Sequence, residues 1–146
     1  MNDLFRENIL EHYQHPRCHG TLEDANVTYE DANPLCGDRI RMDLRIDAGR
    51  IEKVRFSGHG CSISQAAASV MTDLVIGQPI DRAMATHEAF LELMQGRGQI
   101  EPDEDVLEDG IAFAGVAKFP ARIKCALLSW MAFKDAAAQV VTKEEA

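Results

Sequence analysis

The sequence lacks any long apolar segment. No run of 18 or more apolar residues occurs, and a helix that crosses a bilayer needs a run of about that length. Residues 1–6 also lack a basic segment followed by an apolar one, which is the pattern of a secretory signal. We therefore expect neither membrane insertion nor export, and a cytoplasmic protein.

Basic residues are scarce as well. The chain has 15 Lys and Arg against 24 Asp and Glu, which gives a net charge of -9. Such a chain repels phosphate backbones, and no local basic stripe offsets this, so we expect no nucleic-acid partner. Residues 101–108 are strongly acidic. Such a run is typical of a solvated surface, with docking of a basic partner as the alternative.

The four cysteines form no closely spaced pair. Cys18, Cys36, Cys61 and Cys125 are too scattered for a CxxC redox motif or a zinc ribbon. In a cytosolic chain they favour metal binding or thiol chemistry over disulfides. Cys18 stands in a turn between two histidines. Because nothing fixes those three groups, we favour an exposed, unliganded thiol there over a metal site.

The length and composition indicate one globular domain spanning residues 1–146. Hydrophobic residues make up 46% of the chain and charged residues 27%, as in ordinary globular proteins. Apolar spacing predicts an amphipathic helix over residues 3–14 and further helices over about 62–76, over 80–95 and from Pro120 onward. Ser62 or Ser64 is the expected cap of the second helix. Residues 111–116 suggest a helical turn or two.

Between the first two helices, the pattern changes to that of strands. A short strand is expected at 27–29, and 40–46 alternate cleanly. A hairpin loop at 47–50 leads into a returning strand at 51–57. The fold class is therefore α+β, with a small antiparallel three-stranded sheet and helices packed on one face. The apolar face of the 40–46 strand is expected to contain Ile40, Met42, Leu44 and Ile46, and the solvated face Arg39, Arg41, Asp43 and Arg45.

Three cysteines and one aspartate each stand where an element begins. Cys36 and Asp38 precede the first long strand, and residues two apart in an extended chain project to the same side. Cys61 ends a strand and opens a helix, where the helix dipole favours thiolate. Cys125 lies in the first turns of the last helix. Such edges can gather at one end of an α+β fold.

These four groups would form a Cys3Asp set, enough for a tetrahedral zinc ion. Sulfur ligands also suit iron in an iron–sulfur cluster, so ligand type alone leaves both open. The spacing also leaves open that Cys61 and Cys125 are small core residues. Three thiolates and a carboxylate around a divalent ion leave a formal charge of -2, and Arg122 and Lys124, with Arg39, are placed to compensate it. His59, flanked by glycines, is expected to be exposed.

Three motifs in this order resemble those of the IscU/NifU-type iron–sulfur assembly proteins. They are Asn33-Pro34-Leu35-Cys36-Gly37-Asp38, then Gly58-His59-Gly60-Cys61-Ser62-Ile63-Ser64 followed by small residues and Ser69, and finally Arg122-Ile123-Lys124-Cys125. The N-terminal helix ending in His15-Pro16-Arg17 also fits, so the likeness spans almost the whole chain. Two departures resemble the SufU branch of the family. One is Lys124, where IscU-like scaffolds usually carry His, and the other is an acidic insertion at about 96–119.

The resemblance implies a SufE/NifU-like fold and a tightly held Zn²⁺ on Cys36, Asp38, Cys61 and Cys125. It implies a sulfurtransferase-like protein that accepts persulfide sulfur from a SufS-type, PLP-dependent cysteine desulfurase and passes it to other SUF assembly proteins. Cys36 is the expected acceptor, because it lies on a loop and can leave the metal with little rearrangement. Zinc would organise the thiols without supplying electrons.

Two other functions fit the same residues. One is a scaffold on which a [2Fe–2S] cluster is assembled and transferred, with iron or a cluster in place of zinc. Lys124 counts against it, since a familiar ligand is then missing, although three cysteines and Asp38 could still hold a cluster. The other is a purely structural zinc domain that acts as a binding module. Cys18 matches no family motif and is expected to have no role.

Overall fold

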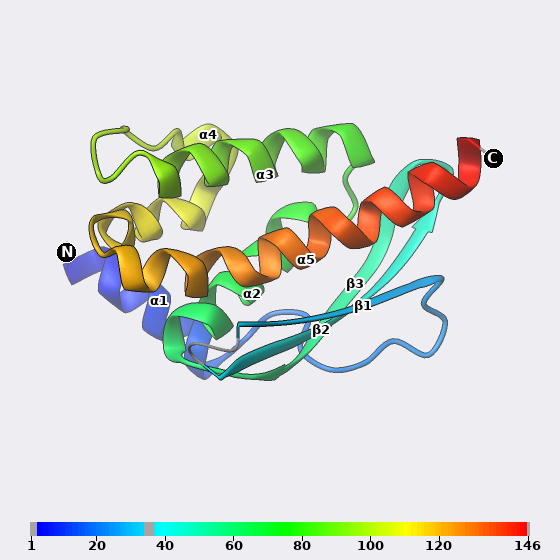
Figure 1. Ribbon diagram of the computed structural model, residues 1–146, viewed down its shortest axis with the longest axis horizontal. Coiled ribbons are helices and arrows are strands. Elements are labelled where there is room, and N and C mark those ends of the chain that lie inside the picture. The colour runs from blue at the N-terminus through cyan, green and yellow to red at the C-terminus, as the bar shows by residue number, and fades with distance from the viewer. Residues whose placement is uncertain (1–2, 34–36, 146) are drawn as a thin grey trace.

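The structure is a computed structural model that describes residues 3–33 and 37–145, with residues 140–145 described by their backbone alone. Helices follow and precede a central run of strands, as Figure 1 shows. The elements in chain order are α1 (Asp3–Gln14), β1 (Val27–Asn33), β2 (Asp38–Asp47), β3 (Arg50–His59), α2 (Ser62–Val75), α3 (Ile80–Gln95), α4 (Glu104–Leu107), the 3-10 helix η1 (Glu108–Lys118) and α5 (Pro120–Glu145).

The three strands form one antiparallel sheet in the order β1-β2-β3. Leu44 in the central strand lies opposite Val27 of β1 and Val54 of β3. All three are buried, so this face of the sheet forms one side of the core. The predicted meander and the predicted apolar face are confirmed: the buried residues on β2 include Ile40, Met42, Leu44 and Ile46.

Asp43 departs from the prediction that it faces solvent. Its exposed fraction is only 1%. The carboxylate accepts hydrogen bonds from the Leu22 backbone N–H at 3.0 Å and from the Thr28 hydroxyl at 2.8 Å, and the Arg41 guanidinium lies 3.1 Å away. The connection between α1 and β1 therefore closes over this part of the outer face. The alternation of β2 alone could not show what covers its polar side.

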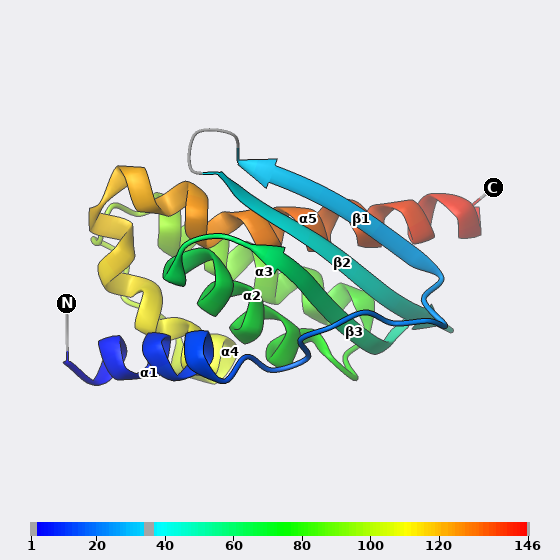
Figure 2. The same cartoon turned by 90° about the horizontal axis from the view of Figure 1, so that it is seen from below.

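The helices lie on one side of the sheet, as Figures 1 and 2 show. α5 packs along β1 and β2, and α2 packs against α5 and β3. Ala66, Ala67 and Ala68 of α2 are fully buried, and their small side chains let neighbouring elements approach closely. Further from the sheet, Trp130 of α5 stacks on Phe90 of α3 with 4.7 Å between ring centroids. The single core therefore lies between the sheet and the helical layer.

A buried histidine on α1 makes polar contacts with two other helices. His12 Nδ1 lies 2.7 Å from the hydroxyl of Ser69 on α2, and His12 Nε2 lies 2.9 Å from the carboxylate of Asp109 on η1. The Ser69 hydroxyl also accepts a hydrogen bond from the Arg17 backbone N–H at 2.8 Å. One polar cluster thus links three elements that are far apart in the sequence.

Of the acidic run at 101–108, residues 101–103 have no regular secondary structure, residues 104–107 form α4, and Glu108 begins η1. The expected turn or two at 111–116 is part of η1, which follows directly on α4. That residues 96–119 are an insertion stays a prediction. No helix in the described part of the chain combines the length and apolar character needed to cross a bilayer.

Candidate metal centre

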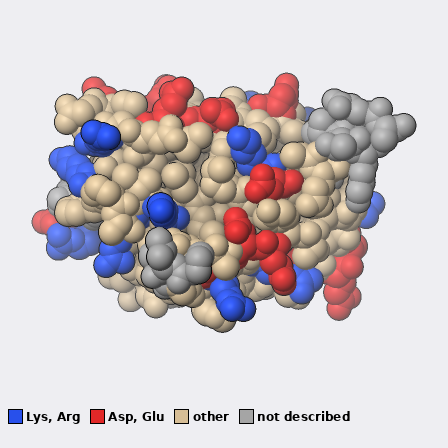
Figure 3. Space-filling model, in the orientation of Figure 1, with Lys and Arg blue, Asp and Glu red and all other residues tan. Residues whose placement is uncertain are grey.

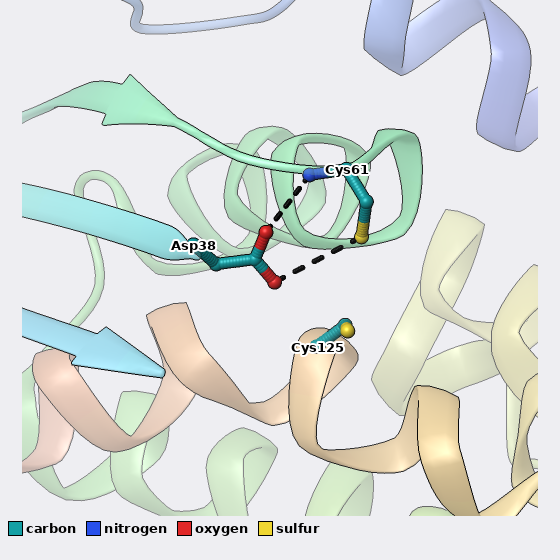
Figure 4. A group of neighbouring side chains, drawn as sticks. All are labelled: Asp38, Cys61 and Cys125. Atoms are coloured by element: carbon teal, nitrogen blue, oxygen red, sulfur yellow. Dashed lines mark hydrogen bonds between the residues drawn. The ribbon is translucent and has the colours of Figure 1, made fainter. Parts of the chain in front are cut away.

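Asp38 is the first residue of β2 and is almost fully buried, with an exposed fraction of 1%. Its Oδ1 accepts a hydrogen bond from the Cys61 backbone N–H at 2.9 Å. Its Oδ2 lies 3.9 Å from the Cys61 sulfur. The carboxylate is therefore held at the point where β2 starts and β3 ends, with its second oxygen directed toward the thiol (Figure 4).

Cys61 is the N-cap of α2. Its backbone is extended, with φ -70° and ψ 168°, and its sulfur accepts from the Ser64 backbone N–H at 3.4 Å. The predicted caps, Ser62 and Ser64, are therefore wrong. The cap is the cysteine itself, because β3 ends at His59, only Gly60 and Cys61 follow it, and the helix starts at Ser62. A sulfur in this position receives the partial positive charge of the helix N-terminus.

Two glycines let the end of β3 pass close to the start of β2. A Cβ on Gly58 would overlap the Arg39 carbonyl, and φ there is +133°, which disfavours other residues. A Cβ on Gly60 would overlap the Asp38 carboxylate and the Ser64 hydroxyl. Sequence reasoning missed this role of Gly60, although a glycine directly before a cysteine at a predicted strand-to-helix junction was the available signal.

Cys125 approaches from the opposite side, on the second turn of α5. It is buried, and its sulfur lies 3.9 Å from the Ala121 carbonyl oxygen. One ligand atom each from Asp38, Cys61 and Cys125 all lie within 4.8 Å of one another. Figure 4 shows the two sulfurs and the carboxylate facing a common point between β2, α2 and α5. The interpretation of Cys61 and Cys125 as unrelated core residues is thereby disfavoured.

These three donors fit a metal that prefers sulfur. In a tetrahedral zinc site, thiolates at about 2.3 Å and a carboxylate at about 2.0–2.2 Å place neighbouring donor atoms roughly 3.5 Å apart. The separations here are at most 4.8 Å, so small side-chain rotations would close the set. Two thiols and one carboxylate suit zinc or iron–sulfur chemistry far better than calcium or magnesium.

Cys36, the predicted fourth ligand and sulfur acceptor, lies outside the described residues. Its place in the set therefore stays a prediction.

Arg122, Lys124 and Arg39 are all exposed. Within the described ranges, none of the three forms an ion pair with Asp38. On the face seen in Figure 3, Lys and Arg side chains gather at the end of the molecule where α5 begins. Their predicted role in offsetting the charge of a loaded site remains a prediction.

Cys18 belongs to no metal-ligating group among the residues that the structure describes. Its side chain is half-buried, not exposed as expected, and packs against the core. Its φ is +54°, and its carbonyl accepts from the Phe56 backbone N–H at 3.0 Å. Cys18 therefore helps to hold the connection between α1 and β1 against β3.

His59 is exposed, as predicted.

The profile of the NifU-like N-terminal domain matches residues 4–126. The chain belongs to the NifU-like N-terminal domain family. The elements around the candidate metal centre, β2, α2 and the start of α5, fall within the matched residues. The resemblance inferred from the sequence motifs is therefore confirmed.

Among the members of this family, the chain is 43% identical over 146 residues to the zinc-dependent sulfurtransferase SufU of Bacillus subtilis, covering 99% of this chain and 94% of that protein. It is 40% identical over 136 residues to the iron–sulfur cluster assembly scaffold protein IscU of Streptococcus pyogenes, covering 93% and 84%.

A solved structure with the same fold is the N-terminal part of a NifU-like protein from Brucella abortus, with a TM-score of 0.87 and 25% identity, covering 97% of this chain and 96% of that one. A second is FiSufU of Fervidobacterium islandicum, described as a scaffold candidate for the SUF system. It has a TM-score of 0.83 and 35% identity, covering 90% and 94%. The predicted α+β fold of the NifU type is confirmed.

Proposed function

We propose that this protein is a zinc-dependent sulfurtransferase of iron–sulfur cluster assembly. The observation that carries the proposal is the convergence of Asp38, Cys61 and Cys125 on one point, within 4.8 Å of one another. The named activity of the Bacillus subtilis SufU relative, 43% identical over nearly the whole chain, supports it. The four proposed ligands are Cys36, Asp38, Cys61 and Cys125.

When bound, zinc supplies a redox-inert centre that keeps the thiols ionised and protected from oxidation. The protein does not hold the four proposed ligands equally firmly. Asp38 and Cys61 are fixed to each other by a 2.9 Å hydrogen bond, and Cys125 is buried on a helix. Cys36 belongs to the connection between β1 and β2. We therefore assign Cys36 as the ligand that can be released.

The proposed reaction moves one sulfur atom between cysteines. The Cys36 thiolate attacks the terminal sulfur of a cysteine persulfide on the partner. The sulfur–sulfur bond of the partner breaks, and the partner's cysteine leaves as a thiolate that takes up a proton. Cys36 then carries the persulfide. The transferred sulfur keeps its oxidation state, so no oxidant or reductant is needed.

The donor in this proposal is a SufS-type, PLP-dependent cysteine desulfurase, and other SUF assembly proteins receive the sulfur, in the cytoplasm. Such a partner must reach the buried centre from outside. The basic side chains of Arg122 and Lys124, at the start of α5, are exposed and come shortly before Cys125 in the sequence. We propose that their positive charges compensate the negative charge of the metal ligands before a partner docks.

The alternative is a scaffold on which a [2Fe–2S] cluster forms, as the name of the Streptococcus pyogenes IscU relative indicates for that protein. The same three donors would serve it, because sulfur ligands suit such clusters. Lys124 occupies the position before the last cysteine, and its amine cannot replace a histidine ligand while protonated. We therefore favour sulfur transfer.

The deciding experiment incubates the purified protein with a cysteine desulfurase and cysteine, and maps persulfides by mass spectrometry of alkylated peptides. We expect one added sulfur on Cys36, abolished in Cys36→Ala together with any stimulation of the desulfurase. Cys18→Ser is the matched control and should behave as the parent. An active Cys36→Ala variant would refute the assignment, and would favour a structural zinc domain if the metal were retained.

A further inference from the structure

A groove of about 500 Å³ separates α1 from the α4–η1 segment. Leu4 and Phe5 of α1 and Ile111 of η1 supply its apolar lining, and Leu4 is 60% exposed. The volume lies within the roughly 300–1,000 Å³ typical of ligand clefts. None of these elements provides Asp38, Cys61 or Cys125, so the candidate metal centre does not explain the groove.

The apolar surface extends beyond the groove itself. Phe5 also lines an adjoining hollow of about 400 Å³, together with Ile100 and Pro102. Ile100 is 43% exposed, and Val106 of α4 is 38% exposed. Figures 1 and 2 show α1 lying beside the α4–η1 segment. Large apolar side chains left open together on one surface indicate an interaction site.

The rim of the groove identifies the charge of its occupant. Four carboxylates line it, from Glu104, Asp105, Glu108 and Asp109. Asp109 contacts His12, whereas the other three are exposed and have no ion-pair partner within the described part of the chain. No described Lys or Arg lines the groove, although Lys118 lines the adjoining hollow. The complement of this rim is a positively charged segment. A second copy of the chain, with a net charge of -9, is a poor match.

Glu108 holds its carboxylate at this rim despite an unfavourable backbone. Its φ is 45° and its ψ is -120°, where glycine is the favoured residue. Its backbone N–H closes α4 by donating to the Glu104 carbonyl. A glycine would make the same hydrogen bond at lower conformational cost.

We propose that this groove, lined by Leu4, Phe5 and Ile111 and rimmed by Glu104, Asp105 and Glu108, docks a basic amphipathic segment of another protein. Apolar side chains of that segment fill the lining, and its Lys or Arg residues pair with the rim. The proposal does not rest on sulfur transfer, and the persulfide assay and the binding test below can fail independently.

The probe is a fluorescein-labelled peptide of Lys and Leu with leucines at helical spacing. It is titrated into the full-length protein as purified, with fluorescence anisotropy as the readout. Two comparison peptides keep the length: one replaces Leu by Ser, and the other replaces Lys by Glu. We expect saturable binding of the Lys/Leu peptide that weakens with salt, and at least tenfold weaker binding of both comparison peptides. Equal binding of the Lys/Ser peptide would overturn the proposal.

Variants of the protein locate the site. The loss of one solvent-exposed ion pair changes affinity by about two- to fivefold. The triple variant Glu104→Gln, Asp105→Asn and Glu108→Gln should therefore weaken peptide binding by roughly tenfold or more. The matched control carries Glu23→Gln, Glu30→Gln and Glu52→Gln, which change the net charge equally on exposed positions elsewhere. If the control weakens binding as much, only general charge attraction is at work and the proposal is wrong.

Two single variants separate docking from folding. Glu108→Gly should raise the melting temperature and weaken peptide binding by about two- to fivefold. Leu4→Ser, at an exposed position, should leave the melting temperature unchanged and weaken binding about tenfold.

NMR locates the bound peptide independently. The amide signals of ¹⁵N-labelled protein that shift when the peptide is added should belong to α1, α4 and η1. Shifts on another surface, or a dimer that these variants dissociate, would contradict the proposal.

Discussion

Asp38 shows how much one side chain can do at the candidate centre. It is a buried carboxylate that accepts the Cys61 backbone N–H at 2.9 Å through one oxygen and leaves the second facing the two sulfurs. A buried carboxylate without a compensating cation is costly. A bound metal ion would supply that compensation. The buried carboxylate of Asp38 by itself therefore favours a metal at this site.

Asp38→Asn is therefore expected to loosen the metal while sparing the fold. The amide oxygen can still accept the Cys61 N–H, but the charge is gone. Zinc affinity, measured by competition with a chromogenic chelator, should fall at least about tenfold. Even the loss of a residue that only hydrogen-bonds to a metal ligand lowers metal affinity by about that much. Asp31→Asn, on β1, is the control and should retain zinc. Unchanged retention in Asp38→Asn would remove the residue from the ligand set.

A second buried group has no part in the metal centre. His87 of α3 is fully buried beside Trp130, and neither of its ring nitrogens has a hydrogen-bond partner within the described residues. Burial lowers the pKa of His87 below its usual value of 6.5; Glu88 and Asp135 oppose the shift, and Lys134 adds to it. The folded protein therefore keeps this ring neutral.

The sign of the pH effect follows from that shift. Between the lowered pKa of the folded state and about 6.5, the unfolded chain binds more protons, so the contribution of His87 to stability is lost as the pH falls. In His87→Met, which cannot titrate, the free energy of unfolding should depend less on pH between about 7 and 5. Chemical denaturation across that range tests it; identical slopes in both proteins would show that His87 is not the group involved.

At the scale of elements, the decisive feature is the junction of β3 with α2. The strand runs to His59 and the helix begins at Ser62, which leaves Gly60 and Cys61 to make the turn. The sequence placed Cys61 at a strand-to-helix junction correctly. It did not reveal that the sulfur itself caps the helix, because serine is a much commoner cap and two of the next three residues are serines.

Gly60→Ala tests this junction. The added Cβ would overlap the Asp38 carboxylate and the Ser64 hydroxyl, so the site must open, at a cost of about 1–3 kcal/mol in stability. We expect a lower melting temperature and weaker zinc retention. Gly110→Ala is the control, since a Cβ there meets only ordinary contacts from 3.4 Å outward. If Gly60→Ala matched the control in both measurements, the close approach of β3 to β2 would not be needed for the site.

At the scale of the whole molecule, the sequence predicted the architecture well. The alternation in 40–46 gave a buried and a polar face, and helical spacing gave α1, α2, α3 and α5. It failed where long-range packing decides the outcome. Asp43 is buried because a distant connection covers it, and Cys18 is half-buried because its turn pairs with β3. The meeting of Asp38, Cys61 and Cys125 likewise depends on tertiary structure, so spacing alone left it open.

The central claim is that these three groups and Cys36 surround one ion. X-ray absorption at the zinc edge, on protein never exposed to chelators, counts the ligands directly. We predict one zinc per chain with three sulfurs at about 2.3 Å and one oxygen at about 2.0–2.2 Å, and two sulfurs in Cys36→Ala. A metal bound by oxygen and nitrogen alone, or by a single sulfur, would contradict the account.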